Sequence, residues 1–237
     1  MDDTLERLAA LIADVPLGAN GQPRLPTERT LASVLDVNRG TLRERLAALE
    51  ILGLIRRKQG SGTYMDIPHP TFIRLYFDMA VKLGHVEVGQ LQEARELIER
   101  EIAGLAATHA SAEDHAKLER CVRRMFDAEN AEDGDEADYE FHMAMALASS
   151  NPVMVLIAEG LSSVLRQLLQ LRRHRMRRDP DLIDRMNANH IPILEAVRDR
   201  DPDRAVAAMD EHFRSWNEMA REIDDLDDLD GRAERAS

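Results

Sequence analysis

The fold is decided by the stretch LPTERTLASVLDVNRGTLRERLAALEILGLIRRKQGSGT, which occupies residues 25–63. Between residues 39 and 52 its leucines recur three or four positions apart, which is the spacing of one face of an α-helix. The leucines concerned are Leu42, Leu46 and Leu49. This spacing predicts a helix over residues 39–52 with a buried leucine face, and Asn38 or Asp36 can cap its start. A shorter helix is expected over residues 27–35.

The end of the same stretch predicts a two-stranded ribbon. Two short runs, residues 54–57 and 63–65, flank a glycine-rich turn at residues 60–62, which is typical of a β-hairpin. Two helices followed by such a ribbon make up a winged helix-turn-helix. We therefore expect a domain of this type over residues 1–67.

The charge of this region differs from that of the whole chain. The formal net charge of the protein is −13, which by itself argues against a nucleic-acid partner. Residues 20–65, however, contain eight arginines and lysines against four acidic residues, a local net charge of +4. A basic region within an acidic chain is the distribution expected of a surface that binds phosphate.

Two arginines stand out near the start of the predicted helix 39–52. Arg39 and Arg43 are four residues apart, so they share a face that is separate from the leucine face. A helix with this arrangement suits the major groove of DNA, where a guanidinium matches guanine or a backbone phosphate. The alternative is a solvated face on which the arginines pair with Glu44 and Glu50. The spacing alone leaves both interpretations open.

The region resembles the winged helix of the GntR family of transcriptional regulators. The resemblance is carried, in the correct order, by Leu25-Pro26-Thr27-Glu28-Arg29, Val37-Asn38-Arg39-Gly40-Thr41-Leu42-Arg43, Leu49-Glu50-Ile51-Leu52-Gly53-Leu54-Ile55 and Gly60-Ser61-Gly62-Thr63. It implies a set of DNA-binding residues, namely Arg29, Asn38, Arg39, Gly40, Thr41, Arg43 and the wing-tip Gly60. Gly40 departs from the family, which often has threonine or another side chain there, so the base read at this position is expected to differ.

The rest of the chain is expected to be helical. Pro68 and Pro70 indicate a boundary, after which the apolar spacing and the capping residues predict an all-α domain of six to seven helices over residues 71–223. The helices are expected near residues 71–83, 87–109, 112–130, 135–149, 152–178, 180–199 and 202–223. The acidic residues 224–237 are expected to form a disordered tail.

The composition excludes several classes of protein. One cysteine, Cys121, rules out a disulfide framework and a cysteine-based zinc site. The sequence contains no apolar run of about 18 residues and no basic-then-apolar signal at the N-terminus, so no membrane association is expected. The cytoplasm is the expected location.

Four residues of the helical region are candidates for a metal site. Asp138 and His142 are four residues apart on one predicted helix, and His190 and His212 each fall within an apolar stripe. A carboxylate and imidazoles that converge in a helical interior can hold a divalent ion. A single inward histidine is more commonly a hydrogen-bonded core residue, and periodicity does not show that the three helices converge.

This region resembles the FCD domain of GntR regulators. The matching segments include Arg95-Glu96-Leu97-Ile98-Glu99, Asp138-Tyr139-Glu140-Phe141-His142, His190-Ile191-Pro192-Ile193 and Met209-Asp210-Glu211-His212. The resemblance implies that Asp138, His142, His190 and His212 bind a divalent metal, with zinc as the first expectation and nickel or manganese as alternatives. It also implies that Arg95 contacts a carboxylate effector; the alternative for Arg95 is a surface pair with Glu99.

Pro192 departs from a regular helix, because proline removes a backbone hydrogen bond two residues after the proposed ligand His190. The sequence as a whole predicts a mainly α-helical, homodimeric regulator on a short palindromic operator of double-stranded DNA. A small carboxylate, hydroxy acid or sugar acid is expected as the effector. Family effectors usually release DNA, which favours a repressor. The alternatives are a regulator that responds to the metal itself and a helical metalloenzyme.

Overall fold

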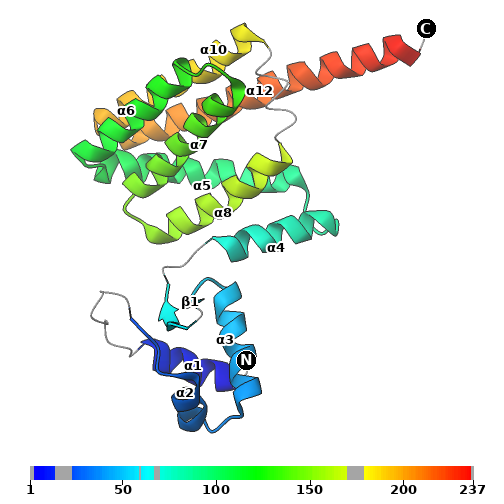
Figure 1. Ribbon diagram of the computed structural model, residues 1–237. Coiled ribbons are helices and arrows are strands. Elements are labelled where there is room, and N and C mark those ends of the chain that lie inside the picture. Colours follow the sequence, from blue (N-terminus) through cyan, green and yellow to red (C-terminus); the bar gives the residue numbers. More distant parts are fainter. Residues whose placement is uncertain (1–2, 14–22, 59, 67–69, 170–178, 236–237) are drawn as a thin grey trace. The chain divides into compact units, whose positions relative to one another are not determined.

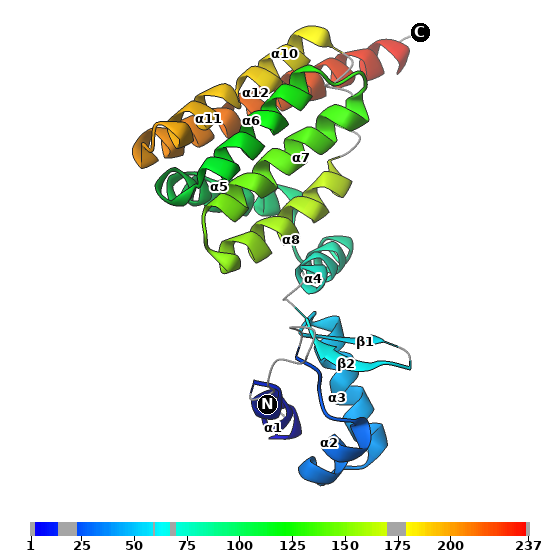
Figure 2. The same ribbon diagram turned by 60° about the vertical axis from the view of Figure 1, so that its left-hand side comes forward.

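The structure is a computed structural model that describes residues 3–13, 23–58, 60–66, 70–169 and 179–235. The chain divides into two compact units, Met1–Tyr76 and Phe77–Ser237, called here the N-terminal unit and the C-terminal unit. Figures 1 and 2 together label the elements of both. The mainly α-helical fold with a small sheet confirms the fold class predicted from the sequence.

The N-terminal unit is a three-helix domain with a two-stranded sheet. Its elements are α1 (Asp3–Ala13), α2 (Glu28–Leu35), α3 (Arg39–Ile51), β1 (Ile55–Lys58) and β2 (Gly62–Met65). Its core is formed by ten buried apolar residues, which are Leu8, Ile12, Leu25, Leu31, Ala32, Leu35, Leu42, Leu46, Leu49 and Ile55. The leucine face predicted for the second helix of the pair therefore lies inward, and the opposite face remains in solvent.

Side-chain caps fix both helices of the helix-turn-helix. Thr27 accepts a hydrogen bond from the backbone nitrogen of Thr30 and begins α2. Asp36 follows α2 in the left-handed region with φ of 55°, where it ends the helix. Asn38, rather than Asp36, caps α3 by accepting from the backbone nitrogen of Thr41 at 2.9 Å. A cap of this kind contributes about 1 kcal/mol to a helix.

The predicted ribbon is an antiparallel hairpin. Ile55 pairs with Met65, and Lys58 pairs with Gly62 at the turn end. Arg24 makes an isolated bridge to Tyr64, so the segment before α2 runs along the outer edge of β2. Only Ile55 of β1 is buried, which leaves the three basic residues of this strand exposed.

The C-terminal unit is a bundle of helices. The bounds are α5 (Val88–His109), α6 (Ala112–Phe126), α7 (Ala131–Ala148), α8 (Pro152–Leu168), α10 (Pro180–Ala188), α11 (Ile191–Arg198) and α12 (Pro202–Arg235). Helix α5 packs against α7, α8, α11 and α12, so it is central to the bundle. In Figure 2 helices α6, α7 and α8 lie next to one another. Within the described residues the strands are confined to the N-terminal unit, as expected.

The boundary between the units differs from the one that the prolines predicted. It falls within helix α4 (Thr71–Lys82) rather than at Pro68 and Pro70. Phe77 and Val81 pack on an apolar cluster of the bundle that includes Leu91 and Trp216, so the second half of α4 belongs to the C-terminal unit.

The helix predicted over residues 180–199 is wrong as a single element. The structure has two helices, α10 and α11, separated by Asn189 and His190. Pro192 occupies the second position of α11. Backbone N–H groups in the first turn have no acceptor within the helix, so the N–H that proline lacks costs no hydrogen bond there. The proline therefore begins a helix instead of bending one.

The expected disordered tail also differs from the structure. Helix α12 continues to Arg235, so residues 224–235 are helical. Leu226 and Leu229 keep the three-residue spacing of a helix, and no proline follows Pro202 to end it. Among the described helices, none has a stretch long and apolar enough to cross a membrane.

Candidate DNA-binding surface and metal centre

The start of α3 presents the residues predicted to meet DNA. Arg39 and Gly40 are exposed in its first turn, and Thr41 is half-buried. The cap uses the Oδ1 atom of Asn38, so the Nδ2 amide is the part of this side chain left for a base or phosphate. A Cβ at position 40 would lie 3.1 Å from that Oδ1 atom, so the glycine relieves crowding at the cap.

An ion pair joins α3 to the start of α2. The Nε atom of Arg43 donates to Oε2 of Glu28 at 2.8 Å, and both side chains are partly or largely exposed. Arg29 is the next residue after Glu28 and is also exposed. The ion pair therefore brings the start of α2 to the arginine face of α3. The pairing with Glu50 suggested by sequence goes instead to Arg57 of the wing.

The wing ends in a glycine turn. Gly60 has φ of +74°, which favours glycine, and no atom lies within 4 Å of the place where its Cβ would be. Lys58 and Arg24 lie over the ring of Tyr64, with their cationic groups 5.6 and 5.9 Å from its centre. The tip is open, so a nucleic-acid backbone can approach it closely.

Three histidines predicted separately come together inside the bundle. His142 lies on α7, His190 directly precedes α11, and His212 lies on α12. One ring nitrogen of each lies within 4.8 Å of the other two. Asp138 is one turn before His142, and its Oδ1 atom is 3.2 Å from Nε2 of His190 and 3.9 Å from Nε2 of His142. The sequence-predicted set of four is therefore one cluster.

The cluster fits a divalent metal. Its four side chains are buried, with 2–7% of their surface exposed. The Nε2 atom of His190 and the Nδ1 atom of His212 are buried without a hydrogen-bond partner among the described residues. A buried nitrogen without a partner is unfavourable, and a metal ion would use its lone pair. Three independently hydrogen-bonded core histidines would not leave Nδ1 of His212 without a partner.

His190 is held so that one of its ring nitrogens faces the cluster. The Nδ1 atom of His190 lies 3.1 Å from the carbonyl oxygen of Met186 and 3.3 Å from that of Asn187. Donation from Nδ1 leaves the lone pair on Nε2, the atom that could bind a metal. The break before α11 supplies this geometry, because it places His190 one turn beyond those two carbonyl groups.

Burial also keeps one histidine neutral. It lowers the pKa of His212 well below its usual range, and the adjacent His190 and His142 lower that pKa further. A neutral imidazole is the form that binds metal. Phe213 and Phe141 contact the rings edge-on, at centroid distances of 5.1 Å from His212 and 5.0 Å from His190. These two rings therefore cover part of the buried cluster.

Arg95 lies inside the bundle rather than on its surface. Its Nε atom donates to Oε1 of Glu99 at 2.5 Å, and the two side chains are 7% and 3% exposed. Burial by itself raises the pKa of Glu99, but Arg95 and His142 outweigh it and hold that pKa at about 2. Burial lowers the pKa of Arg95, whereas Glu99 raises it by more, with a contribution from Asp138. The pair is therefore ionised and belongs to the electrostatic surroundings of the metal cluster.

Glu99 is a site residue that the sequence interpretation missed. Its Oε2 atom contacts Nδ1 of His142, so it links the arginine to one of the clustered histidines. The signal was present, because Leu91, Arg95, Glu99 and Ile102 recur at helical spacing on the face of α5 that is buried. A charged pair within an apolar stripe indicates an internal partner rather than a surface pair.

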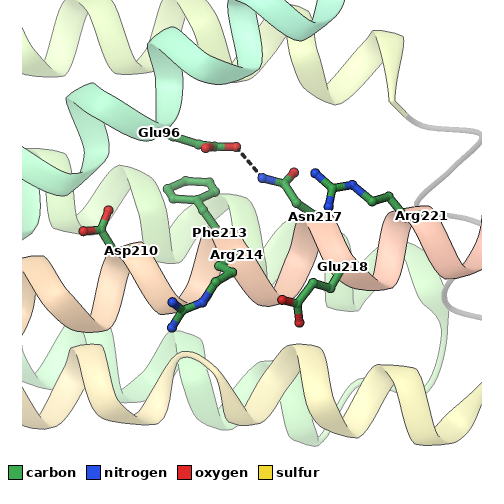
Figure 3. A pocket seen from close by; sticks show the side chains of 7 residues that line it. All are labelled: Glu96, Asp210, Phe213, Arg214, Asn217, Glu218 and Arg221. Carbon is green, nitrogen blue, oxygen red and sulfur yellow. Dashed lines mark hydrogen bonds between the residues drawn. The ribbon is translucent and has the colours of Figure 1, made fainter.

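A cavity of about 340 Å³ is lined by side chains of α5 and α12 (Figure 3). Its lining residues are Glu96, Asp210, Phe213, Arg214, Asn217, Glu218 and Arg221. Phe213 is shared by the two sites, because its ring also lies 5.4 Å from the guanidinium carbon of Arg95. The cavity itself is walled by acids and arginines on the surface and does not contain the metal cluster.

Comparison with known proteins gives the same two-part division. Residues 3–65 match the model of bacterial regulatory proteins of the gntR family, and residues 90–215 match the FCD domain. The chain is 31% identical over 231 residues to an Escherichia coli regulatory protein whose name assigns it to the L-lactate dehydrogenase operon, covering 94% of this chain and 87% of the relative. It is 31% identical over 198 residues to the transcriptional regulator LutR of Bacillus subtilis, covering 83% and 90%.

A solved structure of similar fold is that of a GntR protein from Streptococcus agalactiae. The TM-score is 0.62 at 28% identity, and the match covers 90% of this chain and 96% of the other. The two relatives are named as regulatory proteins, and each match covers most of both chains. The matches therefore include both the winged helix and the bundle. The chain belongs to the GntR family of bacterial transcriptional regulators and carries an FCD effector-binding domain.

Proposed function

We propose that the protein is a homodimeric repressor that binds a short palindromic operator and releases it when a small organic acid binds beside a divalent metal in the C-terminal unit. The observation that carries this proposal is the buried cluster of Asp138, His142, His190 and His212, in which nitrogens without hydrogen-bond partners face a carboxylate. Three nitrogens and one carboxylate suit zinc, with nickel or manganese as alternatives.

The effector would be a small carboxylate with a second oxygen. A metal held by these four side chains would supply open coordination positions for such a molecule. Arg95 is within electrostatic range of both Asp138 and His212, and its hydrogen bond to Glu99 uses one of five N–H groups. One relative is named for an L-lactate dehydrogenase operon. L-lactate, a 2-hydroxy acid, is therefore the first candidate, and sugar acids are the second.

The N-terminal unit would supply operator recognition. Arg39 and Arg43 on α3 and Arg29 on α2 are exposed, and the open tip at Gly60 suits contact with phosphate. We assign base contacts to the α3 arginines and backbone contacts to the wing. A chain that binds chromosomal DNA would act in the cytoplasm.

A dimer is supported by α4. Apolar side chains are exposed three or four positions apart along this helix and just beyond its end, and they are Phe72, Leu75, Tyr76, Met79 and Leu83. A second copy that covers this stripe would bury it, and a twofold protein reads a twofold operator. The organic acid would then shift the population between two arrangements of the paired winged helices.

The proposal is tested by fluorescence anisotropy with labelled DNA from the promoter region of the protein's own gene. Metal-free and zinc-loaded protein are compared with and without L-lactate or a sugar acid, and the double variant His142→Ala/His212→Ala is measured alongside. We expect the wild-type protein to release DNA with zinc and acid together and the double variant to be unresponsive. Release by zinc alone would identify a metal-responsive regulator instead. A lack of DNA binding at low salt under all conditions would refute the proposal.

A further inference from the structure

One carboxylate inside the C-terminal unit is shared by two functional side chains. Oε1 of Glu99 accepts from Nε of Arg95 at 2.5 Å, and Oε2 of Glu99 contacts Nδ1 of His142. All three side chains are buried, with 6%, 2% and 2% of the surface of Arg95, Glu99 and His142 exposed. Arg95 and Glu99 are on α5, whereas His142 is on α7, so the contact crosses the interface between these helices.

The contact determines which nitrogen of His142 carries a proton. Neither Oε2 of Glu99 nor Nδ1 of His142 has another hydrogen-bond partner among the described residues. A carboxylate oxygen only accepts, so a favourable contact requires the proton on Nδ1. In the neutral ring Nε2 then carries the lone pair, and Nε2 is the nitrogen that lies 3.9 Å from Asp138.

We propose that Glu99 is a positioning residue of the metal centre, whose carboxylate selects the tautomer of His142 with Nε2 free to bind metal and is itself oriented by Arg95. This inference rests on the proposed function, because it assumes that the cluster holds a metal. It also assigns Arg95 a role in the absence of effector. Arg95 orients the carboxylate of Glu99, and Glu99 in turn orients the proposed metal ligand His142.

The orientation by Arg95 predicts the effect of a neutral substitution. Glu99→Gln replaces one carboxylate oxygen by an NH2 group, which only donates hydrogen bonds. Nε of Arg95 also only donates, so the amide oxygen must be the atom that accepts from it. The amide nitrogen then faces Nδ1 of His142 and donates to it. The proton of the ring moves to Nε2, and the atom that should bind metal is blocked.

The first measurement is made on the wild-type protein without metal. Two-dimensional NMR of the ¹⁵N-labelled histidine ring distinguishes the two tautomers of His142, with His142→Gln used to assign the signal. We expect the tautomer protonated at Nδ1. A neutral ring protonated at Nε2 would overturn the inference, and this result does not depend on whether any Glu99 variant folds.

The second measurement compares zinc affinity in Glu99→Gln and in a matched control. Zinc binding is measured by competition with a chromophoric chelator, and we expect it to weaken about 10- to 100-fold, the range for losing an outer partner of a metal-bound histidine. The control is Glu96→Gln, on the same helix, which removes one negative charge from a side chain that hydrogen-bonds Asn217 at the surface cavity (Figure 3). We expect the control to bind zinc as the wild type does.

The outcomes separate this inference from the proposed function. If the wild-type protein binds no zinc, nickel or manganese, the proposed metal site fails, and this inference fails with it. If the wild type binds zinc and Glu99→Gln binds it equally tightly with an unchanged His142 tautomer, the inference is refuted and the proposed function stands. Equal weakening by Glu96→Gln would also refute it, because the effect would then be one of net charge.

Discussion

The two units of the protein each contain an arginine bound to a glutamate, in opposite surroundings. Arg43 and Glu28 form their ion pair on the surface of the N-terminal unit, with 65% and 32% of their side chains exposed. Arg95 and Glu99 form theirs inside the C-terminal unit, with 7% and 3% exposed. The same two groups at similar distances therefore face water in one case and the interior of the bundle in the other.

The difference in burial determines whether each arginine can exchange its glutamate for another partner. A surface pair contributes about 0–1 kcal/mol, so Arg43 can exchange Glu28 for a phosphate or a base at small cost. A buried pair has lost its hydration, so removing one partner leaves an unpaired charge in the interior. The exposed arginine is suited to a partner that comes and goes, and the buried arginine is suited to holding a fixed geometry.

The largest expected effect tests this contrast directly. Glu99→Ala should destabilise the C-terminal unit by about 3–5 kcal/mol, because it leaves Arg95 buried without its counterion. Glu28→Ala should cost the N-terminal unit less than about 1 kcal/mol. Chemical unfolding followed by the fluorescence of Trp216, the single tryptophan, reports the first value, and hydrogen exchange of α2 and α3 reports the second. Equal losses in the two units would break the comparison.

The next effect concerns operator affinity. Arg43→Ala should weaken binding to the operator by about 1–3 kcal/mol, or roughly 5- to 150-fold, with almost no change in the melting temperature. Anisotropy titrations at two salt concentrations measure it. The control is Arg123→Ala, an arginine of α6 whose side chain is 66% exposed and pairs with Glu119 at 3.6 Å. Undiminished affinity in Arg43→Ala would remove α3 from the proposed interface.

The sequence predicted most of the fold because periodic patterns determine local structure. Leu42, Leu46 and Leu49 repeat on one helical face, and burying that face against α2 requires a compact helix-turn-helix. The same reasoning placed His190 and His212 inward. It could not show that they meet each other and His142, since convergence depends on how α7, α11 and α12 pack, and that packing depends on residues far apart in the sequence.

Two features were not predicted from the sequence, and each has its own physical reason. Pro192 was expected to distort a helix, whereas its fixed φ and missing donor make it suitable for the first turn of a new one. Glu99 was considered only as a surface partner of Arg95. A pair spaced four residues apart on a helix has the same pattern on the surface and in the core, so burial alone distinguishes the two.

A smaller effect is expected from pH in the metal-free protein. The folded pKa of His212 is depressed below the ordinary value of 6.5, so the unfolded chain takes up a proton at a higher pH than the folded protein does. Stability from this group is therefore complete above about pH 6.5 and falls below it by up to about 1.4 kcal/mol per pH unit.

The pH effect is measured as the free energy of unfolding of the C-terminal unit between pH 7.5 and about pH 5.5, again by Trp216 fluorescence. His212→Gln should reduce the slope by the contribution of one proton, and His85→Gln, at an exposed histidine, should leave it unchanged. A slope that is the same in all three proteins would show that His212 titrates normally. This result would weaken the contrast between an exposed and a buried polar site.

The smallest expected effect compares one helix position in the two units. Gly40 and Gly89 each occupy the second position of a helix, α3 and α5 respectively. Replacing glycine by alanine in a helix interior gains up to about 1 kcal/mol, and less at an end. At Gly89 no atom lies within 4 Å of the new Cβ, whereas at Gly40 the Cβ would lie 3.1 Å from Oδ1 of Asn38. Crowding there disturbs a cap worth about 1 kcal/mol.

Gly89→Ala should therefore stabilise its unit, and Gly40→Ala should change stability by less than about 0.5 kcal/mol. Hydrogen exchange of α3 and α5 measures both, and an equal gain at the two positions would show that the Asn38 cap tolerates a side chain beside it.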